Sequence, residues 1–313
     1  MTNNFYLVWL EWPEKCFRVD AEALRYLKSV VPAGSRVVRA RSEAVFLRDL
    51  PKATHAVVWN FKREWFSRAS RLKVLATPAA GKELVPTEGP EGVEIHFGHF
   101  HGEIMAESAV GFIMAWARGF FFVGRAPESE RAWPRTWLSD KCREVAGTRA
   151  VILGYGNVGK AVARKLAAVG VSSVGITRHG VYSGSSKLRE VEVSDCLRQA
   201  DWLVMVLPST TGTDDYLDAK LIRKLPRRCV VVNIGRGNSI DEEALYSALS
   251  TNRLAGAYLD VRKHEPSGTV PEFGKNVGGL DSLPNCVITP HSSAFSPRYV
   301  LRCFEELKND GCI

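Results

Sequence analysis

The sequence lacks a Cys-x-x-Cys pair, although seven of its 313 residues are cysteine. An odd number of widely spaced cysteines predicts free thiols in a reducing compartment, and it argues against a disulfide framework. The first residues lack the basic start and apolar core of a secretory signal. The most apolar stretch, Val110–Gly124, is too short to cross a bilayer and contains Arg118. We therefore expect a cytoplasmic protein without a membrane partner.

No long run of lysine or arginine is present either, although the formal net charge is +8. A positive net charge favours anionic partners, but basic residues scattered among acids predict a solvated surface and no nucleic-acid partner. The sequence has no Gly-x-Ser-x-Gly motif, which argues against a serine hydrolase of the α/β class. It also has no fixed-period repeat, which excludes solenoids.

Short β-branched segments alternate with helical segments almost from end to end. This pattern predicts an α/β fold of doubly wound parallel sheets. Strands are predicted at Phe5–Leu10, Arg36–Ala40, His55–Asn60, Lys73–Thr77, Val93–Phe97, Ala150–Gly154, Ser173–Thr177, Trp202–Leu207, Cys229–Ile234, Gly256–Val261 and Val287–Thr289. Helices are predicted at Ala21–Val31, Glu43–Asp49, Lys62–Ser70, Gly102–Val123, Lys160–Val169, Ser194–Gln199, Asp218–Lys224 and Glu242–Thr251. Ser239-Ile-Asp-Glu242 fits a capping box at the start of the last of these helices.

A glycine-rich turn, Gly154-Tyr155-Gly156-Asn157-Val158-Gly159, follows one predicted strand and opens a helix. In this context the first glycine permits a tight turn, the second lets the backbone approach a pyrophosphate, and the third allows close packing of helix on strand. The helix N-terminus then offers amides to the phosphates. An ordinary structural turn is the alternative, but the strand-turn-helix context favours a dinucleotide site.

The end of the next strand distinguishes the two nicotinamide dinucleotides. A carboxylate there, about 20 residues after the glycines, would bond a free ribose 2′-hydroxyl. The sequence instead has Thr177-Arg178-His179, whose hydroxyl and guanidinium suit a 2′-phosphate. Arg178 as an ordinary surface arginine is the alternative. We expect NADP to be favoured over NAD.

Three later strands are each followed by a polar residue at the carboxyl edge, where open α/β sheets bind ligands. These residues are Arg236, Glu265 and His291. Arginine offers a planar fork to a carboxylate, glutamate offers a counter-charge, and histidine offers a proton near neutral pH. Each residue also has a structural alternative, such as an ion pair or a core histidine. Together they indicate a site that reduces a 2-oxo acid.

The ordered motifs resemble the D-isomer-specific 2-hydroxyacid dehydrogenase family over nearly the whole chain, glyoxylate/hydroxypyruvate reductases included. The motifs are the glycine-rich turn, Leu207-Pro208-Ser-Thr-Thr-Gly-Thr213, Asn233-Ile234-Gly235-Arg236-Gly, Leu259-Asp260-Val, Glu265-Pro266 and Thr289-Pro-His291. The resemblance implies a Rossmann-type cofactor domain, residues 102–289, inserted into a flavodoxin-like substrate domain. Residues 1–101 would form that substrate domain, to which residues 290–313 would return.

The resemblance also implies roles for individual residues. His291 would donate a proton to the keto oxygen, Glu265 would stabilise the imidazolium, and Arg236 would clamp the substrate carboxylate. Glutamate rather than glutamine at position 265 argues against the formate-dehydrogenase branch. Contacts to the cofactor would come from the glycine-rich turn, from Thr177, Arg178 and His179, and from Leu207, Pro208, Thr213, Ile234, Gly235 and Asp260.

The stretch Ala79-Ala80-Gly81 resembles the family's substrate loop, with His291 and Arg236 as further substrate contacts. It departs from the family's common Gly-Val-Gly, and an ordinary turn is the alternative. Glyoxylate, hydroxypyruvate or another small 2-oxo acid is the expected substrate, because the chain is too short for an added regulatory domain. The glycine-rich stretch Pro266–Leu283 is expected to form a loop near the site.

Three further interpretations concern partners and metals. Some relatives use this scaffold to sense nicotinamide, so a dinucleotide-binding regulator with little turnover is the alternative function. We expect no metal site, because His96, His99 and His101 have no cysteine or acid spaced nearby to complete a zinc set. A homodimer is predicted through the Gly102–Val123 helix. Trp133 and Trp137 are interpreted as core or interface residues, or as a cover for the partner's site.

Overall fold

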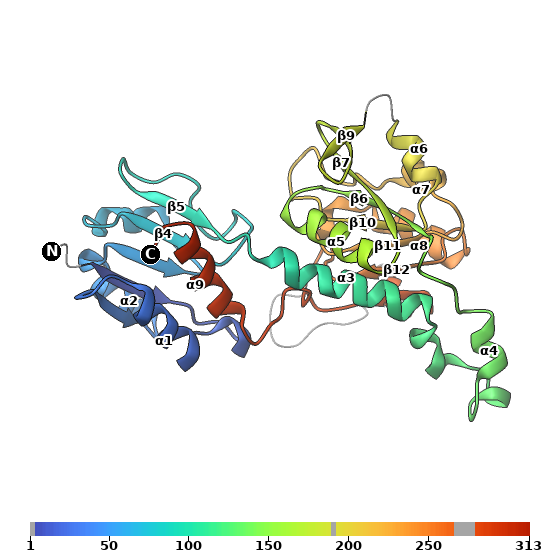
Figure 1. Ribbon diagram of the computed structural model, residues 1–313, viewed down its shortest axis with the longest axis horizontal. Coiled ribbons are helices and arrows are strands. Elements are labelled where there is room, and N and C mark those ends of the chain that lie inside the picture. Colours follow the sequence, from blue (N-terminus) through green and yellow to red (C-terminus); the bar gives the residue numbers. More distant parts are fainter. Residues whose placement is uncertain (1–3, 189–191, 266–278) are drawn as a thin grey trace. The chain divides into compact units, whose positions relative to one another are not determined.

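The computed structural model describes residues 4–188, 192–265 and 279–313 (Figure 1). The chain forms two compact units. The first unit comprises Met1–His101 and Phe295–Ile313, and the second comprises Gly102–Ala294. The stretch predicted to form a loop near the site, residues 266–283, lies largely outside the described residues. Among the described residues, no helix is long and apolar enough to cross a membrane.

The first unit is built on a five-stranded parallel sheet with the order β2-β1-β3-β4-β5. This is the flavodoxin-like order of a doubly wound sheet. The strands are β1 Phe5–Trp9, β2 Arg36–Arg39, β3 His55–Val58, β4 Val74–Thr77 and β5 Glu94–Phe97. The helices are α1 Ala21–Val30, α2 Glu43–Asp49 and α9 Tyr299–Asn309, with 3-10 turns at Lys15–Phe17, Leu50–Lys52 and Arg63–Arg68. The helical segment predicted at Lys62–Ser70 is present as a 3-10 helix, Arg63–Arg68, and not as an α-helix.

An aromatic cluster beside the first sheet explains why these short elements hold together. Phe46, Phe61 and Trp65 are buried against one another, with ring centroids 5.4–6.3 Å apart. Large rings bury more apolar area per residue than aliphatic side chains, which suits a small sheet. Local capping adds to this, since Asp20 Oδ1 accepts a 2.7 Å hydrogen bond from Ala23 N at the start of α1.

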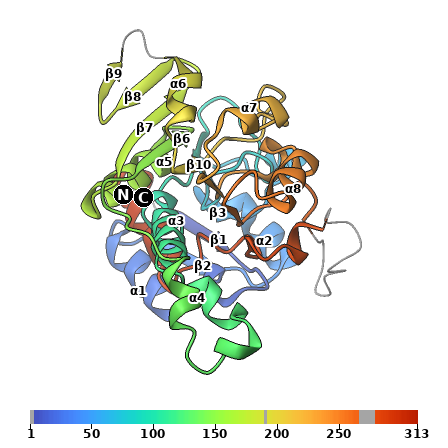
Figure 2. The ribbon, with the colours of Figure 1, turned by 90° about the vertical axis from the view of Figure 1, so that its right-hand side faces the viewer.

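The second unit contains an eight-stranded sheet with the order β13-β12-β11-β10-β6-β7-β8-β9 (Figure 2). The six strands from β13 to β7 run parallel, whereas β8 and β9 form an antiparallel hairpin that extends the edge. The strands are β6 Arg149–Leu153, β7 Ser172–Thr177, β8 Gly180–Ser183, β9 Ser186–Leu188, β10 Trp202–Met205, β11 Val230–Asn233, β12 Gly256–Leu259 and β13 Cys286–Ile288. The strand order reverses between β6 and β10, where ligands bind in such sheets. The predicted α/β fold is confirmed.

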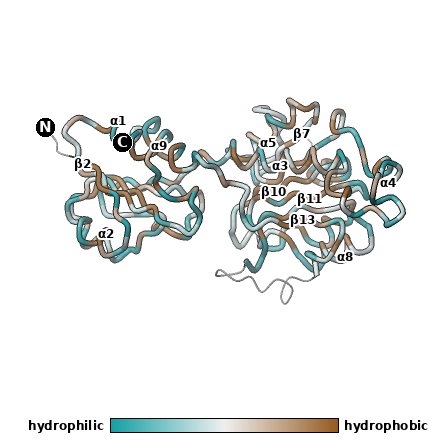
Figure 3. The backbone as a smooth tube through the Cα atoms, turned by 90° about the horizontal axis from the view of Figure 1, so that it is seen from below, coloured by the Kyte–Doolittle hydropathy of each residue, from teal (hydrophilic) through white to brown (hydrophobic). Residues whose placement is uncertain are grey.

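Alternating side chains of the second sheet pack against helices on both faces. Val151 and Leu153 of β6 belong to one core cluster, and Ile152 belongs to the other. The helices are α3 His101–Ala117, α4 Arg135–Ser139, α5 Asn157–Ala168, α6 Val193–Arg198, α7 Ala219–Lys224 and α8 Glu242–Ser250, with 3-10 turns at Phe120–Arg125, Glu128–Glu130, Gly237–Ser239 and Leu280–Ser282. In Figure 3 the central strands β10 and β11 are coloured brown, which marks hydrophobic residues. Strands buried on both faces account for the continuous apolar runs of the sequence.

Three local features of the second unit differ from the prediction: the end of one helix, the cap of another, and a hairpin. The helix predicted at Gly102–Val123 stops at Ala117, because Gly119 takes a left-handed conformation with φ +77° and a 3-10 turn follows. The capping box is wrong as well. Asp241 caps α8 by accepting a hydrogen bond from Ala244 N, while the hydroxyl of Ser239 donates to the carbonyl of Arg236. The β8–β9 hairpin was not predicted.

Candidate active site

The loops that follow β6, β10 and β11 touch at the carboxyl edge of the second sheet. A side chain at Gly154 would place its Cβ 2.4 Å from the carbonyl oxygen of Val206. A side chain at Gly235 would place its Cβ 2.8 Å from the amide nitrogen of Leu207. Only glycine permits this approach of backbones. The predicted cofactor residues 154, 207 and 235 are thus adjacent.

At each of the three glycine positions in the 154–159 turn, a different local feature favours glycine. Gly154 has φ +94°, which side chains rarely adopt, and a Cβ at Gly159 would lie 2.2 Å from the carbonyl oxygen of Gly154. Gly156 differs, because nothing lies within 4 Å of the position of its Cβ. It precedes the first residue of α5, Asn157, and no side chain caps that helix. The free amides and open space fit a pyrophosphate at this end.

Tyr155 is buried inside the turn. Its ring lies where a side chain of Gly175 in β7 would be, with a built Cβ only 2.0 Å away. It also stacks with Tyr182 of β8 at 6.4 Å between ring centroids. The Tyr155 side chain therefore fixes the glycine-rich turn to β7.

The end of β7 is a tight turn, because Thr177 pairs with Gly180 and only Arg178 and His179 lie between them. Thr177 Oγ1 accepts a 3.0 Å hydrogen bond from His179 N. The Arg178 side chain is exposed and its Nε lies 3.1 Å from Nε2 of His179. No acid occurs in this turn.

A pocket of about 770 Å³ lies between α5 and the β8–β9 hairpin. Its lining includes Tyr155, Thr177 and His179 of the predicted cofactor set and two basic residues of α5, Lys160 and Arg164. The three predicted catalytic residues are not among its lining residues. The basic lining is compatible with an anionic group at this end of the cofactor domain.

The loop after β10 is held closed by one threonine. Thr213 Oγ1 donates to the carbonyl oxygens of Pro208 at 2.6 Å and Thr210 at 2.9 Å, and it lies 3.0 Å from the amide of Thr210. A hydroxyl has one proton, so the two carbonyls share that proton, while the hydroxyl oxygen accepts from the Thr210 amide. Leu207, Pro208 and Thr213 thus form one closed turn beside Gly235.

Arg236 follows β11 and is positioned by a buried asparagine. Asn233 Oδ1 accepts from Gly235 N at 3.0 Å, and Asn233 Nδ2 donates to the carbonyl of Arg236 at 3.1 Å. Gly237 then packs against the backbone of Arg262, where a Cβ would approach its carbonyl carbon to 1.9 Å. The Arg236 side chain is half-buried and its Nη1 donates to the carbonyl of Gly235 at 3.0 Å.

Glu265 and His291 form the central contact of the site. Glu265 Oε2 lies 2.9 Å from His291 Nδ1, although 26 residues separate the two in the chain. The hydrogen bond to Glu265 raises the pKa of His291 above its ordinary value, against the opposing effect of burial. Burial raises the pKa of Glu265, but the hydrogen bond with His291 and the charges of His291 and Arg236 lower it by more. The arrangement stabilises a protonated imidazole beside a carboxylate.

The Asp260 carboxylate is buried and holds the loop that carries His291. Oδ1 accepts from Thr289 Oγ1 at 2.5 Å and from Ser292 N at 2.9 Å, and Oδ2 accepts from Ser293 N at 2.9 Å. The Asp260 carbonyl accepts from His291 N at 2.8 Å, and His291 adopts φ +50°. Sequence reasoning placed Asp260 beside the nicotinamide and missed this positioning contact.

A second ion pair holds the segment that carries Glu265. The buried Arg262 pairs with Glu242 of α8 through Nε–Oε1 at 2.9 Å and Nη2–Oε2 at 2.8 Å. Lys263 N donates to the same carboxylate at 2.9 Å. This bidentate pair was not predicted, because nothing in the local sequence connects residues 20 positions apart.

The predicted substrate loop belongs to the first unit and follows β4. Ala79 N donates to Thr77 Oγ1 at 3.2 Å, and the Ala79 carbonyl accepts from Gly98 N at 3.1 Å. Gly98 is required there, since a Cβ would lie 2.3 Å from the carbonyl oxygen of Pro78. Ala80 and Gly81 continue this turn at the carboxyl end of the strand. The amide of Ala79 is therefore already engaged by Thr77.

Comparison with known proteins agrees with this geometry. Residues 110–293 match the model of the D-isomer specific 2-hydroxyacid dehydrogenase NAD-binding domain. A glyoxylate reductase of Thermococcus kodakarensis is 27% identical over 78% of this chain and 74% of its own length. A glycerate dehydrogenase of Methylorubrum extorquens is 26% identical over 70% of this chain and 68% of its own length.

A solved structure covers the whole chain. The NADPH-dependent glyoxylate/hydroxypyruvate reductase of Sinorhizobium meliloti, determined with NADP and sulfate, has a TM-score of 0.70 and 26% identity over 99% of this chain and 94% of that one. The names of these relatives indicate NAD(P)-dependent 2-hydroxyacid dehydrogenase or reductase activity. This chain therefore belongs to the D-isomer specific 2-hydroxyacid dehydrogenase family.

Proposed function

We propose that this protein is an NADP(H)-dependent reductase of small 2-oxo acids such as glyoxylate or hydroxypyruvate, with a D-2-hydroxy acid as the product of a prochiral substrate. The observation that carries the proposal is the 2.9 Å hydrogen bond between Glu265 Oε2 and His291 Nδ1. With Nδ1 engaged by the carboxylate, Nε2 is the nitrogen that gives a proton to the keto oxygen. The bound nicotinamide supplies the hydride.

The other two catalytic roles follow from charge. Glu265 stabilises the imidazolium, so the proton donor persists to higher pH than an isolated histidine allows. Arg236 binds the substrate carboxylate with its planar guanidinium and turns the keto carbon toward the hydride. In the reverse direction neutral His291 accepts the proton from the hydroxyl. We assign substrate contacts also to Ala79, Ala80 and Gly81, with residues 1–101 and 290–313 as the substrate domain.

The cofactor assignment rests on the residues at two strand ends. The open space at Gly156 and the uncapped start of α5 fit the pyrophosphate. We assign the 2′-phosphate of NADP to Thr177 and Arg178, because the turn lacks the carboxylate that would bind a 2′-hydroxyl. The Sinorhizobium meliloti relative, described as NADPH-dependent, supports this preference.

The test is oxidation of NADPH and NADH with glyoxylate, hydroxypyruvate, pyruvate and phenylpyruvate, with His291→Ala as the control. We expect turnover with a small 2-oxo acid, a preference for NADPH, and loss of turnover in the variant. A protein that binds the dinucleotide and turns over none of these acids would instead be a nicotinamide-sensing regulator.

We also propose a homodimer that involves α3 and the segment after it. Support comes from exposed apolar side chains in that segment, namely Phe120 at 68%, Val123 at 46% and Trp133 at 80% exposure. Isolated soluble chains seldom expose several large apolar residues in one segment. The mass measured by light scattering tests the proposal, and a monomeric mass rejects it.

A cytoplasmic location is a further proposal. All seven cysteines are free thiols, five of them buried. Such thiols persist in a reducing compartment. Fractionation of cells that produce the protein tests this location, and recovery from an oxidising compartment contradicts it.

A further inference from the structure

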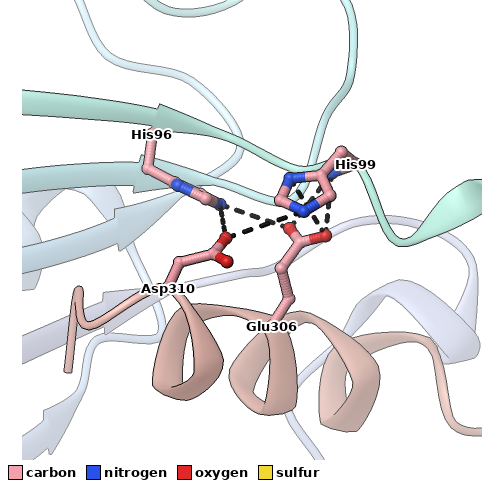
Figure 4. Close-up of side chains that lie close together, drawn as sticks. All are labelled: His96, His99, Glu306 and Asp310. Atoms are coloured by element: carbon pink, nitrogen blue, oxygen red, sulfur yellow. Dashed lines mark hydrogen bonds and ion pairs between the residues drawn. The ribbon is translucent and has the colours of Figure 1, made fainter. Parts of the chain in front are cut away.

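Four side chains outside the catalytic region converge in the first unit: His96, His99, Glu306 and Asp310 (Figure 4). His96 lies in β5, His99 follows that strand, Glu306 lies in α9, and Asp310 ends that helix. One nitrogen or oxygen from each lies within 4.8 Å of the others. Sequence reasoning considered the histidines and found no acid near them, because the acids come from some 200 residues later in the chain.

The shortest separations between these side chains lie in the range of a tetrahedral metal site, and they involve both ring nitrogens of His99 and both oxygens of Glu306. His96 Nε2 lies 3.2 Å from Glu306 Oε1 and 3.6 Å from Asp310 Oδ2. His99 Nδ1 lies 3.3 Å from Glu306 Oε2, and His99 Nε2 lies 3.7 Å from Asp310 Oδ2. A tetrahedron with zinc about 2.0–2.1 Å from each ligand has edges of about 3.4 Å. All four separations exceed the roughly 2.7–2.9 Å that is usual for a charge-assisted hydrogen bond between nitrogen and oxygen.

The surroundings hold the ligands as metal sites usually do. The amide of His99 donates to both oxygens of Glu306, at 3.0 and 3.1 Å, which orients that carboxylate. The other ring nitrogen of His96, Nδ1, lies 3.6 Å from Cys312 Sγ, which turns Nε2 toward the acids. Outer partners of this kind set the orientation of metal-binding histidines.

The negative charges of Glu306 and Asp310 favour a cation at this site. Among the described residues, no lysine or arginine pairs with Glu306 or Asp310, so the ionisable partners of these two carboxylates are the two imidazoles. The Glu306 side chain is 6% exposed, and buried carboxylates need a counter-charge. His99 is 50% exposed, which leaves a path for an ion from solvent.

We propose that these four residues bind one divalent first-row transition metal, Zn²⁺ being the best match. Two imidazoles and two carboxylates at tetrahedral spacing suit zinc, whereas calcium takes six to eight oxygens at longer distances. Four protein ligands make a structural site. The metal joins the C-terminal helix α9 to the edge strand β5, two elements that the chain connects only through the whole second unit.

The first experiment is a Co²⁺ titration of the full-length, metal-stripped protein, followed by Zn²⁺ competition. We expect one Co²⁺ per chain, the strong visible absorption of tetrahedral cobalt, and no thiolate charge-transfer band. Zn²⁺ should displace it and raise the melting temperature. Absence of tight binding, or a thiolate band from a cysteine site, overturns the proposal.

Variants locate the ion. Asp310→Asn and His99→Gln change partly exposed ligands, and each should weaken Zn²⁺ binding by more than the roughly 100-fold of an outer-partner mutation. Glu305→Gln is the matched control, because it removes a carboxylate of the same helix that pairs instead with Arg298. His291→Ala excludes the catalytic pair as the binding site. Equal affinity in wild type and both ligand variants, or loss only in His291→Ala, refutes the site and leaves an ionic contact.

Discussion

Replacement of Glu265 by glutamine should lower the pKa of His291, because it removes the carboxylate that favours the protonated ring. The carboxylate and the ring lie 2.9 Å apart, and the side chains of His291 and Glu265 are 49% and 41% exposed. At such exposure the dielectric is close to that of water, where two unit charges at this distance attract by about 1.4 kcal/mol. Glutamine keeps the shape of the side chain and removes the charge.

The direction of the pH effect follows from the sign of the shift. The folded protein holds the pKa of His291 above its ordinary value, so the protonated form is lost only as pH rises through that higher value. Carbonyl reduction needs the protonated ring, and its kcat/KM should therefore fall at a lower pH in Glu265→Gln than in wild type. For oxidation of the hydroxy acid, the rise of kcat/KM with pH should also occur at a lower pH in the variant, because that direction needs the neutral ring.

Two measurements separate this reasoning from a general loss of function. The pH profile of kcat/KM reports ionisations of the free enzyme, and NMR titration of the His291 ring reports its pKa without any substrate. Glu243→Gln, which removes an exposed carboxylate of α8, is the control and should leave both profiles unchanged. A slow Glu265→Gln enzyme whose His291 titrates as in wild type would refute the electrostatic role.

Four other substitutions test three separate parts of the site. Arg178→Ala should raise the KM for NADPH about tenfold and leave the KM for NADH nearly unchanged, since it removes about 1.4 kcal/mol of phosphate binding. Steady-state kinetics with both cofactors measures the two KM values, and an equal rise in both contradicts the prediction. Asp260→Asn should lower the free energy of unfolding by about 1.5–3 kcal/mol, because the side-chain amide would place an N–H donor against the N–H of Ser293. Urea denaturation measures this free energy, and an unchanged midpoint contradicts the prediction. Gly159→Ala should destabilise the fold by about 1–3 kcal/mol through overpacking against Gly154, whereas Gly156→Ala should keep the fold and weaken cofactor binding. Melting curves measure the first effect and cofactor titration measures the second, and the opposite pattern would refute the assignment.

Much of the second unit could be predicted because parallel sheets bring strand ends together. The strand-turn-helix context of Gly154–Gly159 located the turn correctly. The ends of β12 and β13 are neighbours in the sheet, which is why Glu265 and His291 meet despite their separation in sequence. Their catalytic roles, and that of Arg236, stay predictions until kinetics test them.

What could not be predicted depends on contacts that leave no local pattern. Asp260 stands in the expected motif, but only the folded loop shows that Thr289 and two amides use its carboxylate. Glu306 and Asp310 reach the histidines through the path of the whole chain. The β8–β9 hairpin is a different case. Its two-residue loop Gly184-Ser185, with φ +57° at the glycine, is a hairpin signal that the sequence carries and that we did not use.

The two-residue turn after β7 links two properties that usually vary independently. Arg178 and His179 are the whole loop between β7 and β8. A substitution in this loop that is meant to alter the proposed nucleotide preference therefore also alters the turn that joins the two strands. Aspartate is a good turn former, so Arg178→Asp is a substitution that the backbone tolerates. One added residue would replace the two-residue loop by a longer one, whose geometry sets a different pairing of β7 with β8. Exchange of a side chain at fixed length is therefore the smaller perturbation of this edge of the sheet.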